Sequence, residues 1–249
     1  MPTFDTPEPI SATVEPVVGN VRIIASDRAD TVVELRPYDP LNSSDVKATE
    51  QTRVEFSGGA LSVRAPKSRP FEVSNETRSV EVTIELPVGS RVHGSTGLGD
   101  LHGTGRLGEC RFKSGTGHIQ LDHTGQLDVH TAFGNVVVER VDGNAEITTG
   151  SGRVHVVELD GSAVVKNSNG DTTIGTVTGP VQVRAANGHI VVERAAGAVD
   201  AKTANGSVKV HEVVRGSVVL ETGVNIHVGE RGQSGSTMDL GCDSCRVQA

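Results

Sequence analysis

Basic side chains recur at one position of a repeated unit in the second half of the chain. They are Lys113, His130, Lys166, Arg184 and Lys202, and the last three are evenly spaced, one in every second unit. If successive units add neighbouring strands to one sheet, these side chains form a stripe on its outer face. Acidic residues two positions earlier, at Asp128, Glu146 and Asp200, favour an alternative in which the charges offset one another on a solvated face. We predict that Lys113, Lys166, Arg184 and Lys202 are the binding residues of this stripe.

A second group of side chains could serve acid–base or metal chemistry. Its members are Asp100, His102, His118, Asp122 and His123. However, the nine histidines of the chain are spread over its length, and no serine or cysteine nucleophile stands beside a base. No spacing typical of a metal site occurs either. We therefore expect no catalytic residue, no cofactor and no enzymatic activity.

Two sequence features that often bind metals are incomplete here. Cys242 and Cys245 form a lone C-x-x-C near the C-terminus, whereas structural zinc normally takes four ligands. A calcium-binding β-roll also uses nine-residue units, but it needs aspartate at successive corners. In this chain aspartate follows a repeat glycine only at Asp100 and Asp171. Calcium and zinc are therefore expected to leave the protein unchanged.

The elements that hold these side chains are defined by a glycine repeat. From Gly89 to Gly216, glycine returns nearly always nine residues apart. The second and fourth residues after each glycine are almost all apolar, whereas the residues between them are mostly polar. This alternation is typical of a strand with one buried face. Because two versions of the unit alternate, we predict an all-β fold, a β-solenoid resembling a parallel β-helix, with two strands in each coil of about 18 residues.

The same pattern predicts which side chains face inward. The inward second and fourth positions run from Leu101 to Leu220, and only Gly103 and Thr172 depart from the apolar pattern. Three asparagines recur once in each predicted coil, each directly before a corner glycine: Asn169, Asn187 and Asn205. We expect their stacked amides to form a hydrogen-bonded ladder along one edge.

Residues 1–88 lack the nine-residue repeat but still contain strand patterns. The stretch from Gly19 to Ile24 resembles a separate copy of the repeat unit, and the stretch from Tyr38 to Asp45 has the composition of a loop. We predict an antiparallel β cap over residues 1–88 and repeats over residues 89–249, as one continuous unit with an incomplete last coil. Val224 stands where the next glycine belongs. We expect strand edges at this C-terminal end to mediate self-association or docking.

Composition argues against several classes of partner. The net charge is -8 and lysine and arginine are not clustered, so nucleic acid is not expected as the main partner. No apolar run of about 18 residues occurs, and membrane insertion is therefore not expected. The first residues have neither a basic start nor an apolar signal segment, which predicts a cytoplasmic location.

Several repeat units resemble those of a known bacterial family. They include Thr149-Gly-Ser-Gly-Arg-Val-His-Val, Ala186-Asn-Gly-His-Ile-Val-Val and Thr203-Ala-Asn-Gly-Ser-Val-Lys-Val. Such units are similar to those of β-strand-repeat proteins named "putative adhesins", a functionally uncharacterised family. The resemblance covers most of the chain. It implies a β-solenoid and brings no functional residues with it.

These observations favour a non-enzymatic scaffold that presents flat faces for protein binding or self-assembly. The alternative is a carbohydrate-binding adhesin or a carbohydrate-active β-helix enzyme. Sugar recognition commonly uses the apolar faces of aromatic rings, and Phe133 is the only aromatic residue predicted at a solenoid corner. The scarcity of aromatic residues therefore disfavours the alternative.

Overall fold

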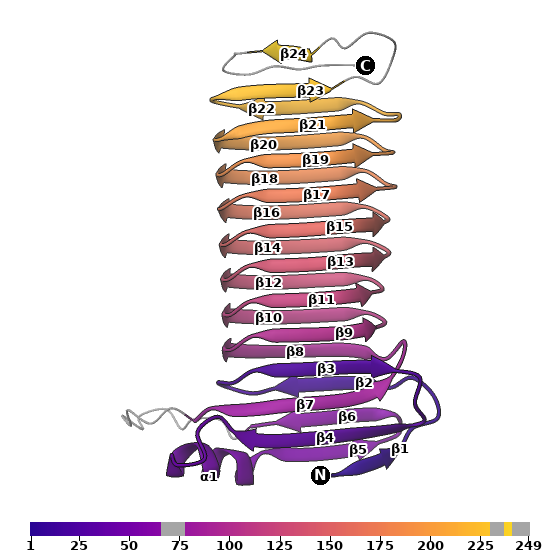
Figure 1. Cartoon of the computed structure of the whole chain (residues 1–249), viewed down its shortest axis with the longest axis vertical. Helices are drawn as coiled ribbons and strands as arrows, with labels where there is room; N and C mark the ends of the chain where they lie inside the picture. Colours follow the sequence, from indigo (N-terminus) through magenta and orange to yellow (C-terminus); the bar gives the residue numbers. More distant parts are fainter. Residues whose placement is uncertain (66–77, 230–236, 241–249) are drawn as a thin grey trace. The chain divides into compact units, whose positions relative to one another are not determined.

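The computed structural model describes residues 1–65, 78–229 and 237–240. It divides into two compact units, residues 1–125 and residues 126–249. Within each unit, strands that follow one another in the repeats alternate between two sheets (Figure 1). Paired strands are two repeat units apart in sequence, as in the pairing of Val154 with Thr172. The predicted all-β solenoid with coils of about 18 residues is therefore confirmed.

The first unit contains two sheets and one helix, α1 (Ser43–Gln51). The strand order of its first sheet is β1 (Thr3–Asp5), β4 (Asp30–Pro37), β7 (Val80–Pro87), β3 (Val21–Ser26), β9 (Leu101–Arg106) and β11 (Ile119–Thr124). The order of its second sheet is β5 (Arg53–Ser57), β6 (Ala60–Arg64), β2 (Ser11–Glu15), β8 (Arg91–Leu98) and β10 (Cys110–Thr116).

The N-terminal strands differ in part from the predicted antiparallel cap. Antiparallel pairing joins β1 with β4, β4 with β7, and β5 with β6. In contrast, β2 pairs in parallel with β8, and β3 pairs in parallel with β9. The reason is that β3 is the predicted copy of the repeat unit: Val21 pairs with Leu101, and Gly19 has the positive φ of a corner glycine, 140°. The antiparallel strands thus lie outside a coil that already follows the solenoid pattern.

Helix α1 corrects the loop predicted from Tyr38 to Asp45. Its N-cap is Asn42, whose side chain accepts a hydrogen bond from the backbone N–H of Ser44 at 2.9 Å. In the first turn, the Asp45 carboxylate is buried and accepts the backbone N–H groups of Asp39 and Ser79 at 3.2 and 2.9 Å. Turn-forming residues here start a helix, because the Asn42 side chain satisfies a free N–H group of its first turn and the Asp45 carboxylate ties that turn to segments outside the helix.

The second unit also consists of two sheets. The strand order of its first sheet is β13 (Val136–Asp142), β15 (Val154–Asp160), β17 (Thr172–Val177), β19 (Ile190–Ala195), β21 (Ser207–Val213), β23 (Asn225–Gly229) and β24 (Thr237–Leu240). The order of its second sheet is β22 (Val218–Thr222), β20 (Val199–Asn205), β18 (Val181–Asn187), β16 (Ala163–Asn169), β14 (Ala145–Ser151) and β12 (Leu127–Phe133). The described pairs are parallel apart from β23 with β24, which is antiparallel.

The core consists of the inward side chains that the alternation predicted. Every predicted second and fourth position is buried, including both departures from the apolar pattern. A Cβ atom at Gly103 would lie 2.6 Å from Leu121 Cδ2, so the glycine leaves room for that leucine. The buried Thr172 hydroxyl accepts a hydrogen bond from Asn167 Nδ2 at 3.3 Å. The exceptions therefore have packing and hydrogen-bonding reasons.

At the C-terminal side of the second unit, β23 has a paired strand at each of its two edges. Val224 is exposed in the turn before β23, and β23 is paired with β21 on one side and β24 on the other. Cys242 and Cys245 lie outside the described residues. Self-association through this end stays a prediction.

Candidate functional site

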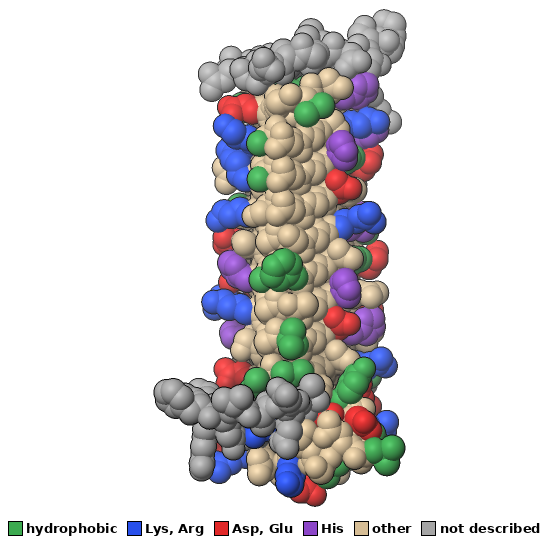
Figure 2. Space-filling view, turned by 90° about the vertical axis from the view of Figure 1, so that its left-hand side faces the viewer, with side chains coloured by type: hydrophobic (Ala, Val, Ile, Leu, Met, Phe, Trp, Pro, Cys, Tyr) green, Lys and Arg blue, Asp and Glu red, His purple; other side chains and the backbone are tan. Residues whose placement is uncertain are grey.

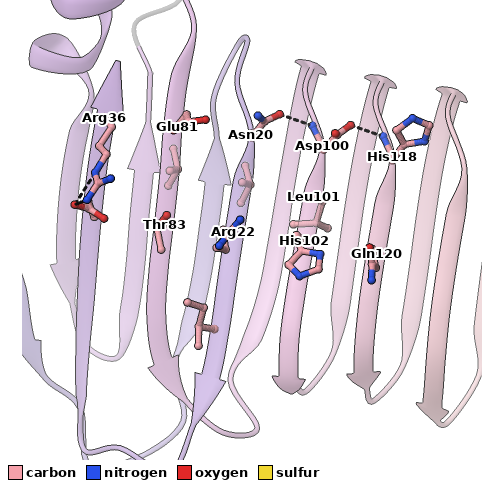
Figure 3. Close-up of a pocket in the computed structure, with 14 residues that line it drawn as sticks. Asn20, Arg22, Arg36, Glu81, Thr83, Asp100, Leu101, His102, His118 and Gln120 are labelled. Atoms are coloured by element: carbon pink, nitrogen blue, oxygen red, sulfur yellow. Dashed lines mark hydrogen bonds and ion pairs between the residues drawn. The ribbon is translucent and has the colours of Figure 1, made fainter. Parts of the chain in front are cut away.

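A hollow of about 570 Å³ lies on the outer face of the first sheet of the first unit (Figure 3). Its lining comes from β4, β7, β3, β9 and β11, which are neighbours in that sheet, and from residues just before β3, β9 and β11. Charged or hydrogen-bonding side chains dominate the lining: Asn20, Arg22, Glu34, Arg36, Glu81, Thr83, Asp100, His102, His118 and Gln120. We call this region the polar hollow.

One row of side chains crosses all five strands of the polar hollow. Glu34 pairs in register with Thr83, and Thr83 pairs with Arg22. Arg22 then pairs with His102, and His102 with Gln120. Neighbouring strands are about 4.8 Å apart, so these groups form a continuous polar line, of which Figure 3 shows Thr83, Arg22, His102 and Gln120 in order.

A second row lies at the corner from which β3, β9 and β11 begin. The backbone N–H of Asp100 donates to Asn20 Oδ1 at 3.0 Å, and the N–H of His118 donates to Asp100 Oδ1 at 2.7 Å (Figure 3). The Asp100 carboxylate therefore holds the backbone of the next coil. The structure brings Asp100, His102 and His118 to the hollow. Asp122 and His123 do not line it, and Asp122 accepts the N–H of Gly105 at 3.2 Å.

Several polar groups of the hollow are not engaged by the described part of the chain. Arg36 forms an ion pair with Glu34 at 2.6 Å. Arg22, Glu81 and His102, by contrast, have no ion pair or side-chain hydrogen bond with any described residue. Arg22 is exposed and the other two are half-buried. The hollow thus retains both a positive charge and hydrogen-bonding groups that a ligand can reach.

Three of the four predicted binding residues form a row on the second sheet of the second unit. Lys166 pairs in register with Arg184, and Arg184 pairs with Lys202. Lys113 belongs to β10 of the first unit, where it pairs with Ser95. The three later residues of the predicted stripe therefore form a row in the second unit, whereas Lys113 lies on a strand of the first unit.

Each cation of this row lies beside a carboxylate. The ion pairs are Lys166 Nζ to Glu146 Oε1 at 3.5 Å, Arg184 Nη2 to Asp200 Oδ2 at 2.5 Å, and Lys202 Nζ to Glu221 Oε2 at 2.5 Å. Hydrogen bonding from Arg184 lowers the pKa of Asp200, and hydrogen bonding from Lys202 lowers the pKa of Glu221. This is the charge-compensated arrangement considered as the alternative to a basic stripe. A role of Lys113, Lys166, Arg184 and Lys202 in binding stays a prediction.

The Asp200→Asn variant is expected to lose a small, pH-dependent amount of stability. The pKa of Asp200 is lowered from its ordinary value of 3.8, so the ion pair stabilises the fold above about pH 4, and this contribution is lost as the pH falls through the folded-state pKa. At pH 7 the substitution should cost at most about 1 kcal/mol, because the pair is largely exposed. Urea denaturation of both proteins should show a difference that shrinks below about pH 4. A difference that stays constant with pH would contradict this account.

Polar residues directly after corner glycines have a structural role in the second unit. Asn135 Oδ1 accepts the N–H of Arg153 at 2.8 Å, and Asn144 Oδ1 accepts the N–H of Ser162 at 3.0 Å. In the same way, His189 Nδ1 accepts the N–H of Ser207 at 3.1 Å. Each side chain thus provides an acceptor for the equivalent residue of the next coil, which fixes the stacking of successive corners.

The predicted asparagine ladder is confirmed. Asn187 Nδ2 donates to Asn169 Oδ1 at 2.7 Å, and Asn205 Nδ2 donates to Asn187 Oδ1 at 2.9 Å. The ladder lies at the ends of β16, β18 and β20, on the side of the second unit that faces the viewer in Figure 2. On this side, uncharged groups occupy the middle, some of them hydrophobic, and charged side chains of both signs and histidines lie along the margins. The described ladder amides bind one another, which supports a structural role.

Two substitutions of His189 are expected to differ in their cost. The His189→Asn variant keeps a side-chain acceptor, as at Asn135 and Asn144, and should change the free energy of unfolding by less than about 0.5 kcal/mol. The His189→Leu variant removes the acceptor of the Ser207 N–H and should cost about 1 kcal/mol. Thermal unfolding of both variants measures the difference. Equal losses would show that the hydrogen bond to Ser207 is unimportant.

Neither a metal cluster nor a membrane-spanning helix occurs in the described part of the chain. No group of three or more His, Cys, Asp or Glu side chains among these residues could hold a metal ion. No described helix is long and apolar enough to cross a membrane.

The comparison with protein families gives a match over most of the chain. The model of the family described as Toastrack DUF4097 matches residues 14–227. The chain belongs to the Toastrack DUF4097 family. The predicted relationship to uncharacterised β-strand-repeat proteins is therefore confirmed, whereas the Toastrack match gives no support to the name adhesin. No curated protein matches this Toastrack chain.

A solved structure from Parabacteroides distasonis ATCC 8503, described as a putative lipid binding protein, is similar to the Toastrack chain. The two sequences are 12% identical, and the similarity covers 93% of this chain and 94% of that chain. The TM-score is 0.48. At this level the likeness carries no argument about the ligand of the Toastrack chain.

Sequence reasoning missed the polar hollow because its side chains are far apart in the chain. Arg22 precedes the glycine repeat and His102 lies within it, and the two become neighbours only when β3 pairs with β9. One signal was nevertheless present, since the stretch from Gly19 to Ile24 is a copy of the repeat unit. Aligning that copy with the first coil places Arg22 at the position of His102, which is how the Toastrack structure arranges them.

Proposed function

We propose that this Toastrack chain is a non-enzymatic β-solenoid scaffold that binds a protein partner, with the polar hollow as the main contact surface. The observation that carries the proposal is the row through Arg22 and His102. Its hydrogen-bonding groups lie unused on a floor of five paired strands. Paired strands fix the positions of these groups before binding, so little ordering is needed when a partner docks.

The chemistry of the hollow supports binding rather than catalysis. Its described lining includes no serine or cysteine, and the Asp100 carboxylate already accepts the backbone N–H of His118. A general base must reach the proton that it removes, and a nucleophile needs such a base beside it. The row of Lys166, Arg184 and Lys202 is a weaker candidate contact, because acidic neighbours offset its charges.

A carbohydrate-binding adhesin is the alternative function. Phe133 is exposed at a corner of the second unit, as predicted, and could stack on a sugar ring. The described lining of the polar hollow contains no Phe, Tyr or Trp side chain. The alternative is therefore supported by the exposed ring of Phe133 and not by the lining of the polar hollow.

Site-specific crosslinking tests the proposed function. A photo-crosslinking amino acid is placed at Thr83, inside the polar hollow, in the full chain expressed in its native cells. The matched control is Thr13, a half-buried threonine on the outer face of β2 in the other sheet of the first unit. We expect one identified protein to crosslink at Thr83 and not at Thr13. Equal products at both positions, or no protein product at Thr83, would refute the proposal, and a glycan product would favour the alternative.

We also propose that the chain self-associates through its C-terminal end and is located in the cytoplasm, and each of these has a separate test. Self-association through the C-terminal end is checked by light scattering over a concentration series, in which the apparent mass should rise with concentration. The cytoplasmic location is checked by cell fractionation. A constant monomer mass would refute self-association and leave the binding of a different protein intact.

A further inference from the structure

Arg22 differs from half of the fourteen described arginines in its neighbours. A carboxylate lies within 4.0 Å of each of the following side chains: Arg28, Arg36, Arg64, Arg111, Arg140, Arg184 and Arg194. Arg22 is exposed, has no such partner among the described residues, and lies in the polar hollow. An exposed guanidinium in a hollow is a ready partner for an oxyanion, which it can bind through two parallel N–H groups.

The side chains beside Arg22 complete a set of donors for such an anion. Its register neighbours are the Thr83 hydroxyl on β7 and the His102 imidazole on β9, and the Gln120 amide follows on β11. Each of these groups can donate a hydrogen bond, and neighbouring strands are about 4.8 Å apart. An oxyanion above Arg22 therefore has an uncharged donor on each side along this row.

The charges around this position select the kind of oxyanion. Glu81 and Asp100 also line the hollow, whereas the charge of Glu34 is offset by Arg36. The lining thus holds two positive and three negative charges, so an anion beside Arg22 should carry as little negative charge as possible, and a carboxylate carries only one. A phosphate group carries a charge of about -1.5 to -2 at pH 7 and would bring excess negative charge toward Glu81 and Asp100.

We propose that the polar hollow binds one carboxylate, held by Arg22 and hydrogen-bonded by Thr83, His102 and Gln120. This inference rests on the proposed function and deepens it, because the carboxylate is assigned to an aspartate or glutamate side chain of the protein partner. A small free carboxylic acid has the same chemistry and is the other source. The two sources are separated by comparing a peptide with acetate.

An NMR titration of the full ¹⁵N-labelled chain tests the carboxylate site. The signals followed are the side-chain N–H groups of Arg22 and Gln120, and chloride keeps the ionic strength constant. The probes are sodium acetate, inorganic phosphate, the peptide acetyl-Gly-Ser-Glu-Ser-Gly-amide and its counterpart with glutamine in place of glutamate. The variants are Arg22→Gln and, as a matched control, Arg91→Gln, an exposed arginine on β8 in the other sheet of the same unit.

We expect acetate to shift both signals of the wild type and to saturate with a Kd of about 1 mM. The Gln120 signal should need at least about tenfold more acetate in Arg22→Gln and should be unchanged in Arg91→Gln. The glutamate peptide should bind more tightly than acetate, and the glutamine peptide should not saturate. Equal affinity of acetate and the glutamate peptide would support the site and identify a free acid as its ligand.

Three results would overturn the carboxylate site: shifts that never saturate, equal titrations in Arg22→Gln and wild type, or phosphate binding as tight as acetate. If crosslinking at Thr83 still yields one protein while the titrations fail, the proposed function stands and the carboxylate inference is wrong. If acetate binding saturates but crosslinking from position 83 captures no protein, the carboxylate site stands and the proposed protein partner is wrong.

Discussion

Replacing Val192 with aspartate is expected to unfold the coils around β19, with a loss of about 5 kcal/mol or more. Val192 is fully buried and pairs in register with Ile174 and Val210, which are also fully buried. A carboxyl group at this position has no described polar partner within the row. Burying an unpaired charge or an unsatisfied acid costs several kcal/mol, in addition to the lost apolar contacts. Because a whole domain is stable by only about 5 to 15 kcal/mol, this single change is severe.

The Val191→Asp variant is the control for this experiment. Val191 is the preceding residue of the same strand, faces outward, and pairs in register with Thr173 and Lys209. The same chemical change there should alter the free energy of unfolding by less than about 1 kcal/mol. Circular dichroism during thermal unfolding compares the two variants. If both lose the same stability, the alternation does not separate the core from the surface in β19.

The Gly188→Val variant is expected to cost at least about 3 kcal/mol. Gly188 has a φ of 134°, a backbone conformation that residues with a Cβ atom rarely adopt. A Cβ atom at this position would also lie 2.1 Å from the carbonyl oxygen of Gly170 in the preceding coil. The stacked corner must therefore open to accept any side chain, and a β-branched residue is the worst case.

Ala186→Val is a matched control for the corner glycine. Ala186 is exposed near the end of β18, two residues before Gly188. Adding the same branched side chain there should change stability by less than about 0.5 kcal/mol, because an exposed strand position tolerates it. Differential scanning calorimetry of both variants is the measurement. Equal melting temperatures of the Gly188→Val and Ala186→Val proteins would contradict the close packing of successive corners.

The parts of the fold that repeat could be predicted from the sequence, because one short pattern specifies both burial and stacking. Val192 and Val191 were assigned to opposite faces from alternation alone, and the amides of Asn169 and Asn187 were predicted to bond from their regular spacing. Helix α1 was missed because it is a single short element, whose buried Asp45 is held by the distant N–H of Ser79. The Arg22 site was missed for a similar reason, since its register depends on the pairing of two segments that are distant in sequence.

The pairing of β3 with β9 also has a consequence for how the chain folds. In the second unit, paired strands are separated by the length of one coil, whereas Val21 and Leu101 are separated by several coil lengths. The entropy lost on closing the longer loop is greater by about 1 kcal/mol. Coils of the second unit can therefore form one after another from contacts close in sequence, while the first unit must bring its ends together before β3 gains its neighbour. Hydrogen exchange during refolding should accordingly protect the strands around β16 and β18 before the N–H groups of β3.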